Sequence, residues 1–201
     1  MNNLPIPFNQ LPSSATKRYE LEKNHTLFRQ GEQVSSLFYV AKGEVTLSRY
    51  GSAGNEVTIH VAQSKETFAE AALFSDVYHC NAVLTKHSQL WEINKSATLA
   101  FAEDNSSFAI DLTERFAKQI QQLRSQKELL AVRSATERVY MALNQGLLNT
   151  SIKQFASSIG LTHEATYRAL AQLVRKNRVI KQARGCYNLS ERPHKGPKII
   201  G

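Results

Sequence analysis

Cysteine is scarce in this chain: Cys80 and Cys186 are the only two in 201 residues. They are too few for a disulfide framework, and they lack the spacing of a cysteine-rich zinc or iron–sulfur site. No window of about 18 residues is apolar enough to span a bilayer. The start, MNNLPIPFNQLPSS, has no basic segment followed by an apolar run, so it does not read as a secretory signal. The sequence therefore predicts a cytoplasmic protein with no membrane partner and no metal.

Motifs of enzymatic chemistry are also missing. There is no His-x-His pair, nucleophile elbow, phosphate loop or pair of carboxylates with clear catalytic spacing. We therefore predict that the chain is not an enzyme. The alternative is a metal-dependent cupin-like barrel enzyme with a helical tail, for which the nearest candidate ligands are His79 and Cys80. Metal analysis of the purified protein distinguishes the two.

Charge is divided unevenly along the chain. Residues 1–107 contain 9 Lys/Arg and 11 Asp/Glu, a net charge of −2, whereas residues 108–201 contain 16 Lys/Arg and 6 Asp/Glu, a net charge of +10. A strongly basic half joined to a slightly acidic half is typical of nucleic-acid binding. A solvated basic face is the alternative.

Short strands are predicted across residues 16–96, after a Pro- and Asn-rich start at 1–15 that we expect to drape over them. The segments LFYV (37–40), EVTLSRY (44–50), 57–61, 82–84 and 90–93 are apolar or alternate between apolar and polar residues, with glycine-containing turns between them. Many short strands of this kind predict a sandwich or jelly-roll barrel, a fold that often holds small ligands.

The period changes to that of a helix from about Ser107. Neither glycine nor proline occurs between Phe108 and Leu143, which predicts a helix over 107–132 and a further one over 136–144. An apolar stripe this long favours a coiled-coil-like homodimer, with packing against the chain's own barrel as the alternative. The predicted dimer seam is Leu112, Phe116, Ile120, Leu123, Lys127 and Leu130.

The stretch 151–180, SIKQFASSIGLTHEATYRALAQLVRKNRVI, carries two amphipathic segments joined at Gly160. Gly160 suits a helix C-cap and Thr162 suits the next N-cap. This is the layout of a helix-turn-helix, whose second helix enters the major groove of DNA. A plain helical hairpin is the alternative. A basic hairpin follows, of the kind that lies along phosphates as a wing. The predicted DNA-binding residues are Thr162, His163, Glu164, Thr166, Tyr167, Arg168, Arg175, Lys176 and Arg184.

A barrel, a long helix and a winged helix-turn-helix, in that order, resemble the cyclic-AMP receptor protein and fumarate–nitrate regulator (Crp/Fnr) family of bacterial transcription factors. The marks are Gly31 in FRQGEQ, Gly43 in LFYVAKGEVTL, Gly54, FAEAALFS at 68–75 and the run IGLTHEATYRAL. The resemblance covers nearly the whole chain. It implies an α+β fold with a cyclic-nucleotide-binding-like β-jelly-roll at 1–106, a dimerisation helix at 107–132 and a DNA-binding domain at 133–201.

By this resemblance, Glu164 and Arg168 read a G·C pair. The chemistry agrees, because a carboxylate accepts from the cytosine amino group and a guanidinium donates to guanine O6 and N7. An intrahelical Glu–Arg pair is the structural alternative. The function expected is that of a homodimeric regulator reading a palindromic site, with double-stranded DNA, a second copy of itself and RNA polymerase as partners. A regulator that acts by protein contact without DNA is a further alternative.

The family's nucleotide pocket is altered here. A Gly-Glu turn followed by Arg-Ser becomes Ala69-Glu70 and then Cys80-Asn81, so the arginine that pairs with the cyclic phosphate is absent. Lys65 stands where a turn glycine is usual. These departures argue against cyclic AMP as the effector. The candidate effector pocket consists of Phe68, Ala69, Glu70, Cys80, Asn81, Leu123 and Arg124.

No cofactor is predicted. An iron–sulfur centre is excluded by the cysteine count, while heme or another small-molecule effector stays an open alternative, with His25, His60, His79 and His87 as candidate ligands. Cys80 is a candidate redox sensor if nearby His79 favours its thiolate, and an inert buried thiol is the competing interpretation.

Overall fold

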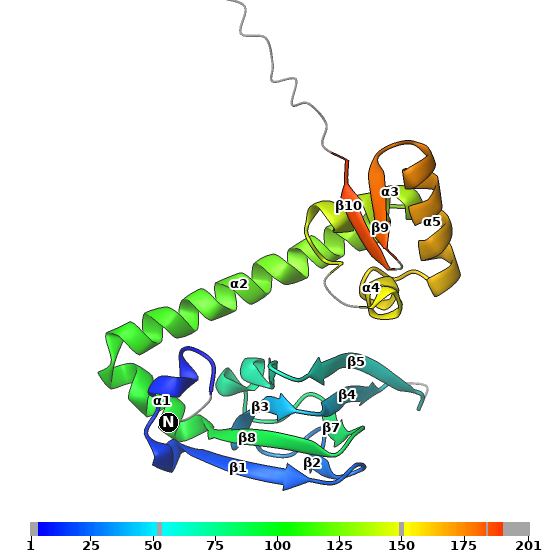
Figure 1. Cartoon of the computed structure of the whole chain (residues 1–201). Coiled ribbons are helices and arrows are strands. Elements are labelled where there is room, and N and C mark those ends of the chain that lie inside the picture. The colour runs from blue at the N-terminus through cyan, green and yellow to red at the C-terminus, as the bar shows by residue number, and fades with distance from the viewer. Residues whose placement is uncertain (1–3, 52–53, 149–150, 184, 191–201) are drawn as a thin grey trace, which may run out of the picture. The chain divides into compact units, whose positions relative to one another are not determined.

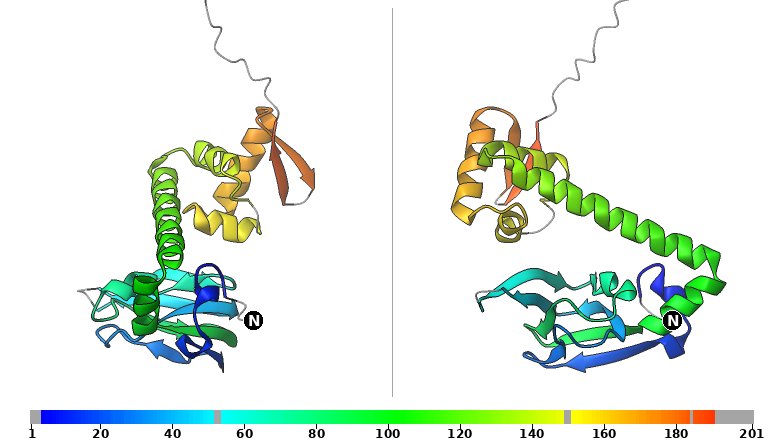
Figure 2. Two further views of the ribbon diagram at one scale, coloured as in Figure 1. Left: turned by 90° about the vertical axis from the view of Figure 1, so that its left-hand side faces the viewer. Right: turned by 180° about the vertical axis from the view of Figure 1, so that it is seen from behind.

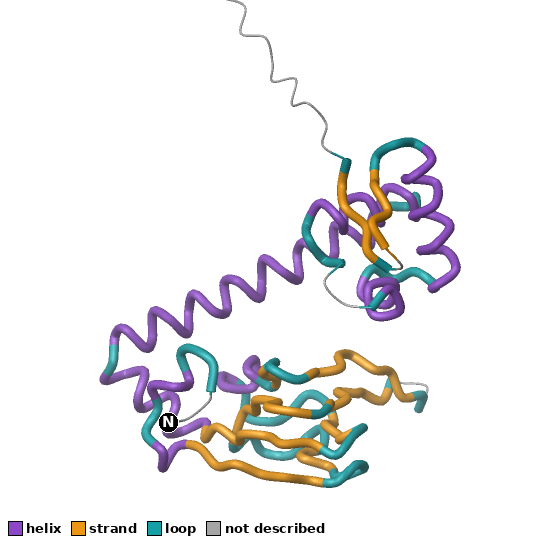
Figure 3. The backbone as a smooth tube through the Cα atoms, in the orientation of Figure 1, coloured by secondary structure: helices purple, strands orange, loops and turns teal. Residues whose placement is uncertain are grey.

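The computed structural model describes residues 4–51, 54–148, 151–183 and 185–190. The chain divides into two compact units, Met1–Phe116 and Ala117–Gly201. Strands dominate the first unit and helices the second, while the continuous helix α2 (Ser106–Ala131) contributes residues to both (Figures 1 and 3).

Two four-stranded antiparallel sheets form the framework of the first unit. One contains, in spatial order, β1 (Thr16–Leu21), β8 (Ser88–Asn94), β3 (Ser36–Lys42) and β6 (Thr67–Phe68). The other contains β2 (Thr26–Phe28), β7 (Asn81–Leu84), β4 (Glu44–Tyr50) and β5 (Glu56–Gln63). The five predicted strands are thereby confirmed, and the two sheets agree with the expected sandwich-like jelly-roll.

The apolar run LFYV is buried on both faces of its sheet. Phe38 and Val40 of β3 face the core between the sheets, which also holds Phe28 and Phe68. Leu37, which points the other way, contacts a second core. Because successive side chains of a strand alternate between faces, a run with no polar break requires cover on both sides.

The second core of this unit lies between the β1–β8–β3–β6 sheet and the segments that cover it. Phe8 of the 3-10 helix η1 (Phe8–Gln10) is fully buried there, which agrees with the expectation that the first residues drape over the domain. A second short 3-10 helix, η2 (Ser13–Ala15), leads into β1. Helix α1 (Lys95–Asp104) follows β8 directly and was not predicted. Asn94 ends β8 and also caps α1, its Oδ1 accepting from the Ala97 amide at 2.8 Å, so no turn residue marks the boundary.

Strand β5 lies at the edge of its sheet, paired only with β4. The prediction of a half-buried strand over 57–61 is wrong for its first half, because Val57 and Ile59 are 50% and 52% exposed. As an edge strand β5 is paired on one side only, and its residues 56–60 are all exposed.

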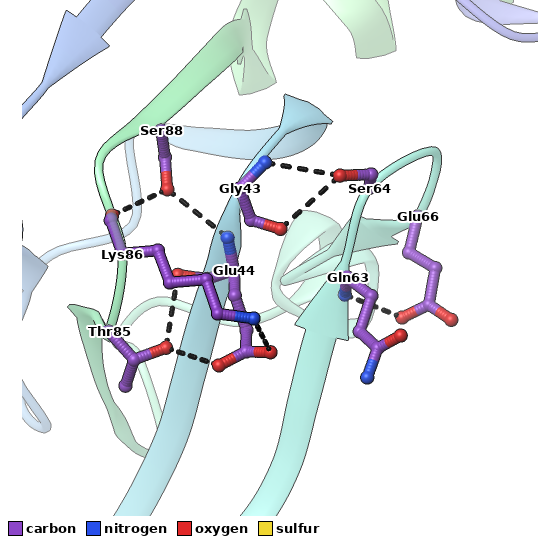
Figure 4. A network of polar contacts seen from close by, with 8 residues as sticks. All are labelled: Gly43, Glu44, Gln63, Ser64, Glu66, Thr85, Lys86 and Ser88. Carbon is purple, nitrogen blue, oxygen red and sulfur yellow. Dashed lines mark hydrogen bonds and ion pairs between the residues drawn. The ribbon is translucent and has the colours of Figure 1, made fainter. Parts of the chain in front are cut away.

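A polar network fixes the turn between β3 and β4 (Figure 4). Gly43, at φ +108°, approaches Ser88 so closely that a Cβ on Gly43 would lie 2.1 Å from Ser88 Oγ. That hydroxyl accepts from the Glu44 amide at 3.2 Å. The Glu44 carboxylate accepts from Thr85 Oγ1 at 2.7 Å and from Lys86 Nζ at 2.8 Å. Glycine is therefore required here by both φ and space.

The second unit is built from the end of α2, three shorter helices and a hairpin. These are α3 (Ala135–Asn144), α4 (Ile152–Ser158), α5 (His163–Arg175), β9 (Val179–Ala183) and β10 (Cys186–Leu189), the last two forming the antiparallel pair seen in Figure 2. Its core is made by apolar side chains of all these helices, with Phe155, Ile159, Leu170 and Leu173 fully buried. The helix predicted over 136–144 is confirmed.

Candidate functional site

The turn between α4 and α5 has the local chemistry that the sequence predicts. Gly160 adopts φ +63°, and the Leu161 amide donates to the Ala156 carbonyl at 2.9 Å, which closes the end of α4. Thr162 then caps α5, its Oγ1 accepting from the Ala165 amide at 3.1 Å. Phe155 and Ala156 are buried on the inner face of α4.

Helix α5 is strongly two-sided. Its apolar face, with Ala169, Leu170 and Leu173, is buried in the core of the second unit. The other face of its first turns exposes His163, Glu164, Tyr167 and Arg168. The His163 and Tyr167 rings meet edge to face with their centroids 4.7 Å apart. This leaves a carboxylate, a guanidinium and an aromatic pair at the solvent surface of one short helix.

Thr166 does not belong to that surface. Its side chain is fully buried, and its hydroxyl donates to the Thr162 carbonyl at 3.0 Å. The prediction that Thr166 contacts DNA is therefore wrong, because a buried hydroxyl bonded to its own helix cannot reach a base or a phosphate. Its position follows from the packing of α5, since it shares the helix face of Ala169 and Leu170.

The basic residues after α5 differ in what they contact. Arg175 and Lys176 are exposed at the end of the helix, and Arg184 lies outside the described residues. Arg178 is held internally: its Nη1 lies 2.5 Å from Glu137 Oε1, and its guanidinium lies 3.6 Å from the centre of the Tyr140 ring. Arg178 therefore joins the hairpin to α3.

The predicted dimer seam falls into two groups. Leu112 is only 5% exposed and packs in the second core of the first unit, with Phe116 half-buried against the same core. The prediction that Leu112 forms a dimer contact is therefore wrong, because packing against its own domain already covers it. Further along α2 the stripe is open to solvent: Ile120, Leu123 and Leu130 are 49%, 64% and 52% exposed, and Lys127 is exposed as well.

The predicted effector-pocket residues are placed mainly in the first unit. Phe68 is buried in the core between the sheets, and Asn81 Oδ1 accepts from the Gln30 amide at 2.9 Å. Ala69 and Lys65 both adopt a positive φ, 63° and 75°, so the left-handed turn conformation is kept without glycine. Leu123 and Arg124 are exposed residues of α2 that belong to the second unit.

Glu70 contacts a residue that the sequence did not single out. It begins η3 (Glu70–Phe74), is 8% exposed, and accepts a hydrogen bond from Thr67 Oγ1. Arg115 of α2 donates through Nη2 to the same Thr67 hydroxyl and lies 4.0 Å from Glu70 Oε1. No sequence signal marks Arg115, which sits among other polar residues on a long amphipathic helix. The turn that begins at Glu70, part of the predicted effector pocket, is thus bound by the chain's own guanidinium.

Burial raises the pKa of the Cys80 thiol, and the positive charge of Arg49 offsets this only in part. Arg49, and not His79, is the group that lowers this pKa, and the contact of His79 Nε2 is with Ser75 Oγ at 3.3 Å. A raised pKa disfavours the thiolate at neutral pH, which counts against the redox-sensor interpretation of Cys80.

Neither a metal-binding cluster nor a membrane-spanning helix occurs among the residues that the structure describes. Within them, no three His, Cys, Asp or Glu side chains gather into a group that could hold a metal ion. None of the described helices combines the length and apolar character that a bilayer crossing requires.

Comparison with known proteins places the fold. Residues 18–105 match the cyclic nucleotide-binding domain family. An anaerobic regulatory protein of Bacillus subtilis is 22% identical over 138 residues, which cover 68% of this chain but only 58% of that protein. The structure of the sensor domain of the transcriptional regulator DNR from Pseudomonas aeruginosa is 28% identical, covers 57% of this chain and 78% of that one, and gives a TM-score of 0.51.

A match over nearly the whole chain is found with the catabolite activator protein of Thermus thermophilus. It is 22% identical, covers 93% of this chain and 91% of that one, and has a TM-score of 0.52. These matches confirm the resemblance drawn from the sequence, in the sensor-like domain and in the fold.

Proposed function

We propose that this chain, which carries a cyclic nucleotide-binding domain and has the fold of the Crp/Fnr-family transcription regulators, is a homodimer that binds DNA sequence-specifically. In this proposal residues 1–106 are a sensor-like domain, 107–132 the dimerisation helix, and 133–201 a winged helix-turn-helix. Helices α4 and α5 form the helix-turn-helix and the β9–β10 hairpin forms the wing.

The observation that carries the proposal is the exposed face of α5. Glu164 and Arg168 lie four residues apart on the solvent side of a helix whose opposite side is buried. Residues at this spacing share one helix face, so both can reach one base pair in the major groove. The net charge of +10 over residues 108–201 supplies the attraction to phosphates.

Dimerisation is supported by the open part of α2. Ile120, Leu123, Lys127 and Leu130 follow each other at intervals of three, four and three residues, the spacing of a coiled-coil seam. Because the chain itself leaves the three apolar members about half exposed or more, a second copy of α2 is the partner that fits them. A twofold dimer presents two α5 helices to half-sites one turn of DNA apart.

The effector of this regulator is proposed not to be cyclic AMP. The pocket lacks the phosphate-binding arginine, and its remaining carboxylate, Glu70, contacts Arg115 of the same chain. Contact with RNA polymerase is a further expectation from the family.

The decisive experiment is selection of bound duplexes from a randomised pool by the purified protein without added ligand, followed by sequencing. We expect a palindrome with a conserved G·C pair in each half-site. Arg168→Ala should remove the preference at that pair, a loss of about 1–3 kcal/mol in discrimination. Lys176→Ala is the matched control: it should weaken all duplexes alike and reduce the salt slope by about 1.

Two outcomes contradict the proposal. If no sequence is enriched and binding to random duplex shows no salt dependence, the chain does not act through DNA, and a regulator working by protein contact is favoured. If a palindrome is enriched but Arg168→Ala leaves its consensus unchanged, α5 is not the helix that reads it.

A further inference from the structure

The guanidinium of Arg138 donates hydrogen bonds to backbone carbonyl groups at two separate helix ends in the second unit. From α3, Arg138 reaches back to the end of α2, where Nη2 and Nε donate to the Val132 carbonyl at 2.6 and 3.0 Å. Nη2 also donates to the Leu130 carbonyl at 3.3 Å. Across from these, Nη1 donates to the carbonyls of Ile159 and Gly160 at 3.2 and 3.3 Å.

These four carbonyls need partners. The last carbonyls of an α-helix find no N–H donor within the helix, and the aligned peptide dipoles leave a partial negative charge at this C-terminal end. Leu130 lies in the last turn of α2, and Ile159 and Gly160 directly follow α4. A planar guanidinium with five donors can serve both helix ends at once, which a single ammonium on a flexible chain cannot do with the same geometry.

An apolar contact lies beside this polar one. A Cβ built on Gly160 would lie 2.7 Å from Leu130 Cδ2 and 3.7 Å from Arg138 Nη1. The end of α2 is therefore packed directly on the turn that precedes α5. Only Leu161 and the cap Thr162 separate Gly160, which carries the last bound carbonyl, from His163 at the start of α5.

We propose that Arg138 is a positioning residue that fixes the direction of α5 relative to the end of α2. This rests on the proposed function in one respect, namely that α5 is the helix that reads DNA. The linker between α2 and α3, residues 132–134, is too short to act as a free tether, and Arg138 fastens it to the α4–α5 turn. A movement of the end of α2 is thereby passed toward α5 through the Arg138 guanidinium, in addition to the apolar contact of Leu130 with the turn.

The test measures the geometry without using DNA. Spin labels are placed on exposed positions, Gln126→Cys on α2 and Ala171→Cys on α5, in a full chain with Cys80→Ser and Cys186→Ser. Dilution with unlabelled chain removes spin pairs between protomers. Pulsed electron–electron double resonance then gives the distribution of distances between the spin label on α2 and the one on α5. We expect Arg138→Gln to broaden or shift this distribution.

Arg178→Gln is the matched control. It removes a half-buried arginine that also contacts α3 but touches neither α2 nor the α4–α5 turn. It should lower the melting temperature and leave the distance distribution narrow. Arg138→Lys keeps the charge but not the fork of donors, so we expect an intermediate broadening, and this variant carries the test if Arg138→Gln fails to fold.

A DNA measurement adds the functional consequence. The ratio of affinities for the selected and a scrambled duplex should fall on the order of tenfold in Arg138→Gln and stay unchanged in Arg178→Gln. If the distribution in Arg138→Gln or Arg138→Lys is as narrow and centred as in the wild type, the proposal is overturned. If the distribution broadens although the wild type selects no sequence, the positioning role of Arg138 is supported and the proposed DNA function fails.

Discussion

Arg115 of α2 and Glu70 of η3 form an ion pair inside the first unit, with Nη2 4.0 Å from Oε1 and the two side chains only 24% and 11% exposed. Glu70 is the carboxylate that the resemblance to the Crp/Fnr family assigns to the nucleotide pocket. Thr67 lies between them and bonds to both. The pair therefore fastens the start of α2 to the sheets without any ligand, and a molecule that used Glu70 would have to displace a guanidinium first.

Removing Arg115 should destabilise the first unit. Arg115→Ala leaves the Glu70 carboxylate and the Thr67 hydroxyl with one donor fewer in a largely buried site, a loss of about 1–3 kcal/mol. The measurement is chemical unfolding monitored by tryptophan fluorescence of Trp91. In a double-mutant cycle with Glu70→Gln, the two losses should be less than additive. Strict additivity would show that the pair contributes no interaction energy.

Cyclic AMP should not bind. A ligand that binds only the folded protein stabilises it by RT ln(1 + L/Kd) at a free ligand concentration L, so the melting temperature rises with the logarithm of the ligand concentration above Kd. We expect no rise at millimolar cyclic AMP, because Cys80-Asn81 replaces the Arg-Ser of the family's pattern and Glu70 already pairs with Arg115. Isothermal titration calorimetry is the direct check, and a saturable heat signal would contradict the prediction.

Leu112 and Leu123 of the same helix should respond in opposite ways. Leu112 is buried at 5% exposure, so Leu112→Ala should cost about 2–5 kcal/mol of folding free energy. Leu123 is 64% exposed, so Leu123→Glu should leave the fold intact and dissociate the proposed dimer. Sedimentation velocity and circular dichroism measure the two effects. A Leu123→Glu protein that still sediments as a dimer would locate the interface elsewhere.

His60 and Glu66 form a half-exposed pair whose contribution depends on pH, with His60 Nε2 3.5 Å from Glu66 Oε2. The hydrogen bond that the His60 imidazole donates to the Glu66 carboxylate raises the pKa of His60 above its ordinary 6.5, and the same bond lowers the pKa of Glu66 below its ordinary 4.5. Because the pKa of His60 is raised, His60 stabilises the folded state below pH 6.5, and this contribution is lost as the pH rises through the shifted pKa. Because the pKa of Glu66 is lowered, Glu66 stabilises the folded state above pH 4.5, and this contribution is lost as the pH falls through the shifted pKa.

The pair should therefore contribute fully between pH 4.5 and 6.5, by at most about 1 kcal/mol because both side chains are half exposed. His60→Gln should remove the alkaline decline in unfolding free energy. The acid decline should persist, since Lys86 and Thr85 also lower the pKa of Glu44. A pH series of denaturant titrations tests this, and an unchanged alkaline limb in His60→Gln would refute it.

Cys80 should react with iodoacetamide more slowly than Cys186. Burial raises the pKa of Cys80 and shields its Sγ, whereas Cys186 is exposed at the start of β10. Peptide mass spectrometry after timed alkylation at neutral pH gives the two rates. Faster reaction at Cys80 would restore the redox-sensor interpretation.

Local features were predictable because their causes lie within a few residues. Gly160 allows the left-handed turn and Thr162 supplies the cap from its own position, so both could be assigned without a fold. The run LFYV identified a strand by its composition alone. Helix α1 was missed because its cap, Asn94, is also the last residue of β8, and no turn separates the two elements.

Burial and long-range pairing were decided by the tertiary structure. Leu112 and Leu123 belong to one apolar stripe of helical periodicity on α2. The chain's own first unit covers Leu112 and leaves Leu123 exposed, and the periodicity does not distinguish the two leucines. The polar neighbours of Thr166 in the sequence predict an accessible side chain, whereas the packing of α5 buries it in the second unit. Arg115 meets Glu70 across 45 positions of the chain, and Arg138 meets Ile159 across 21.

The sequence by itself determined five of the strands, the turn at Gly160 with its cap at Thr162, and the uneven charge, because each depends on residue type and near neighbours. The tertiary structure decided which faces are covered and which charged groups are engaged. Burial and ion pairing depend on the packing of segments that are distant in the chain. Periodicity alone does not show which of two apolar side chains on the same helix face, such as Leu112 and Leu123, will be covered by another segment.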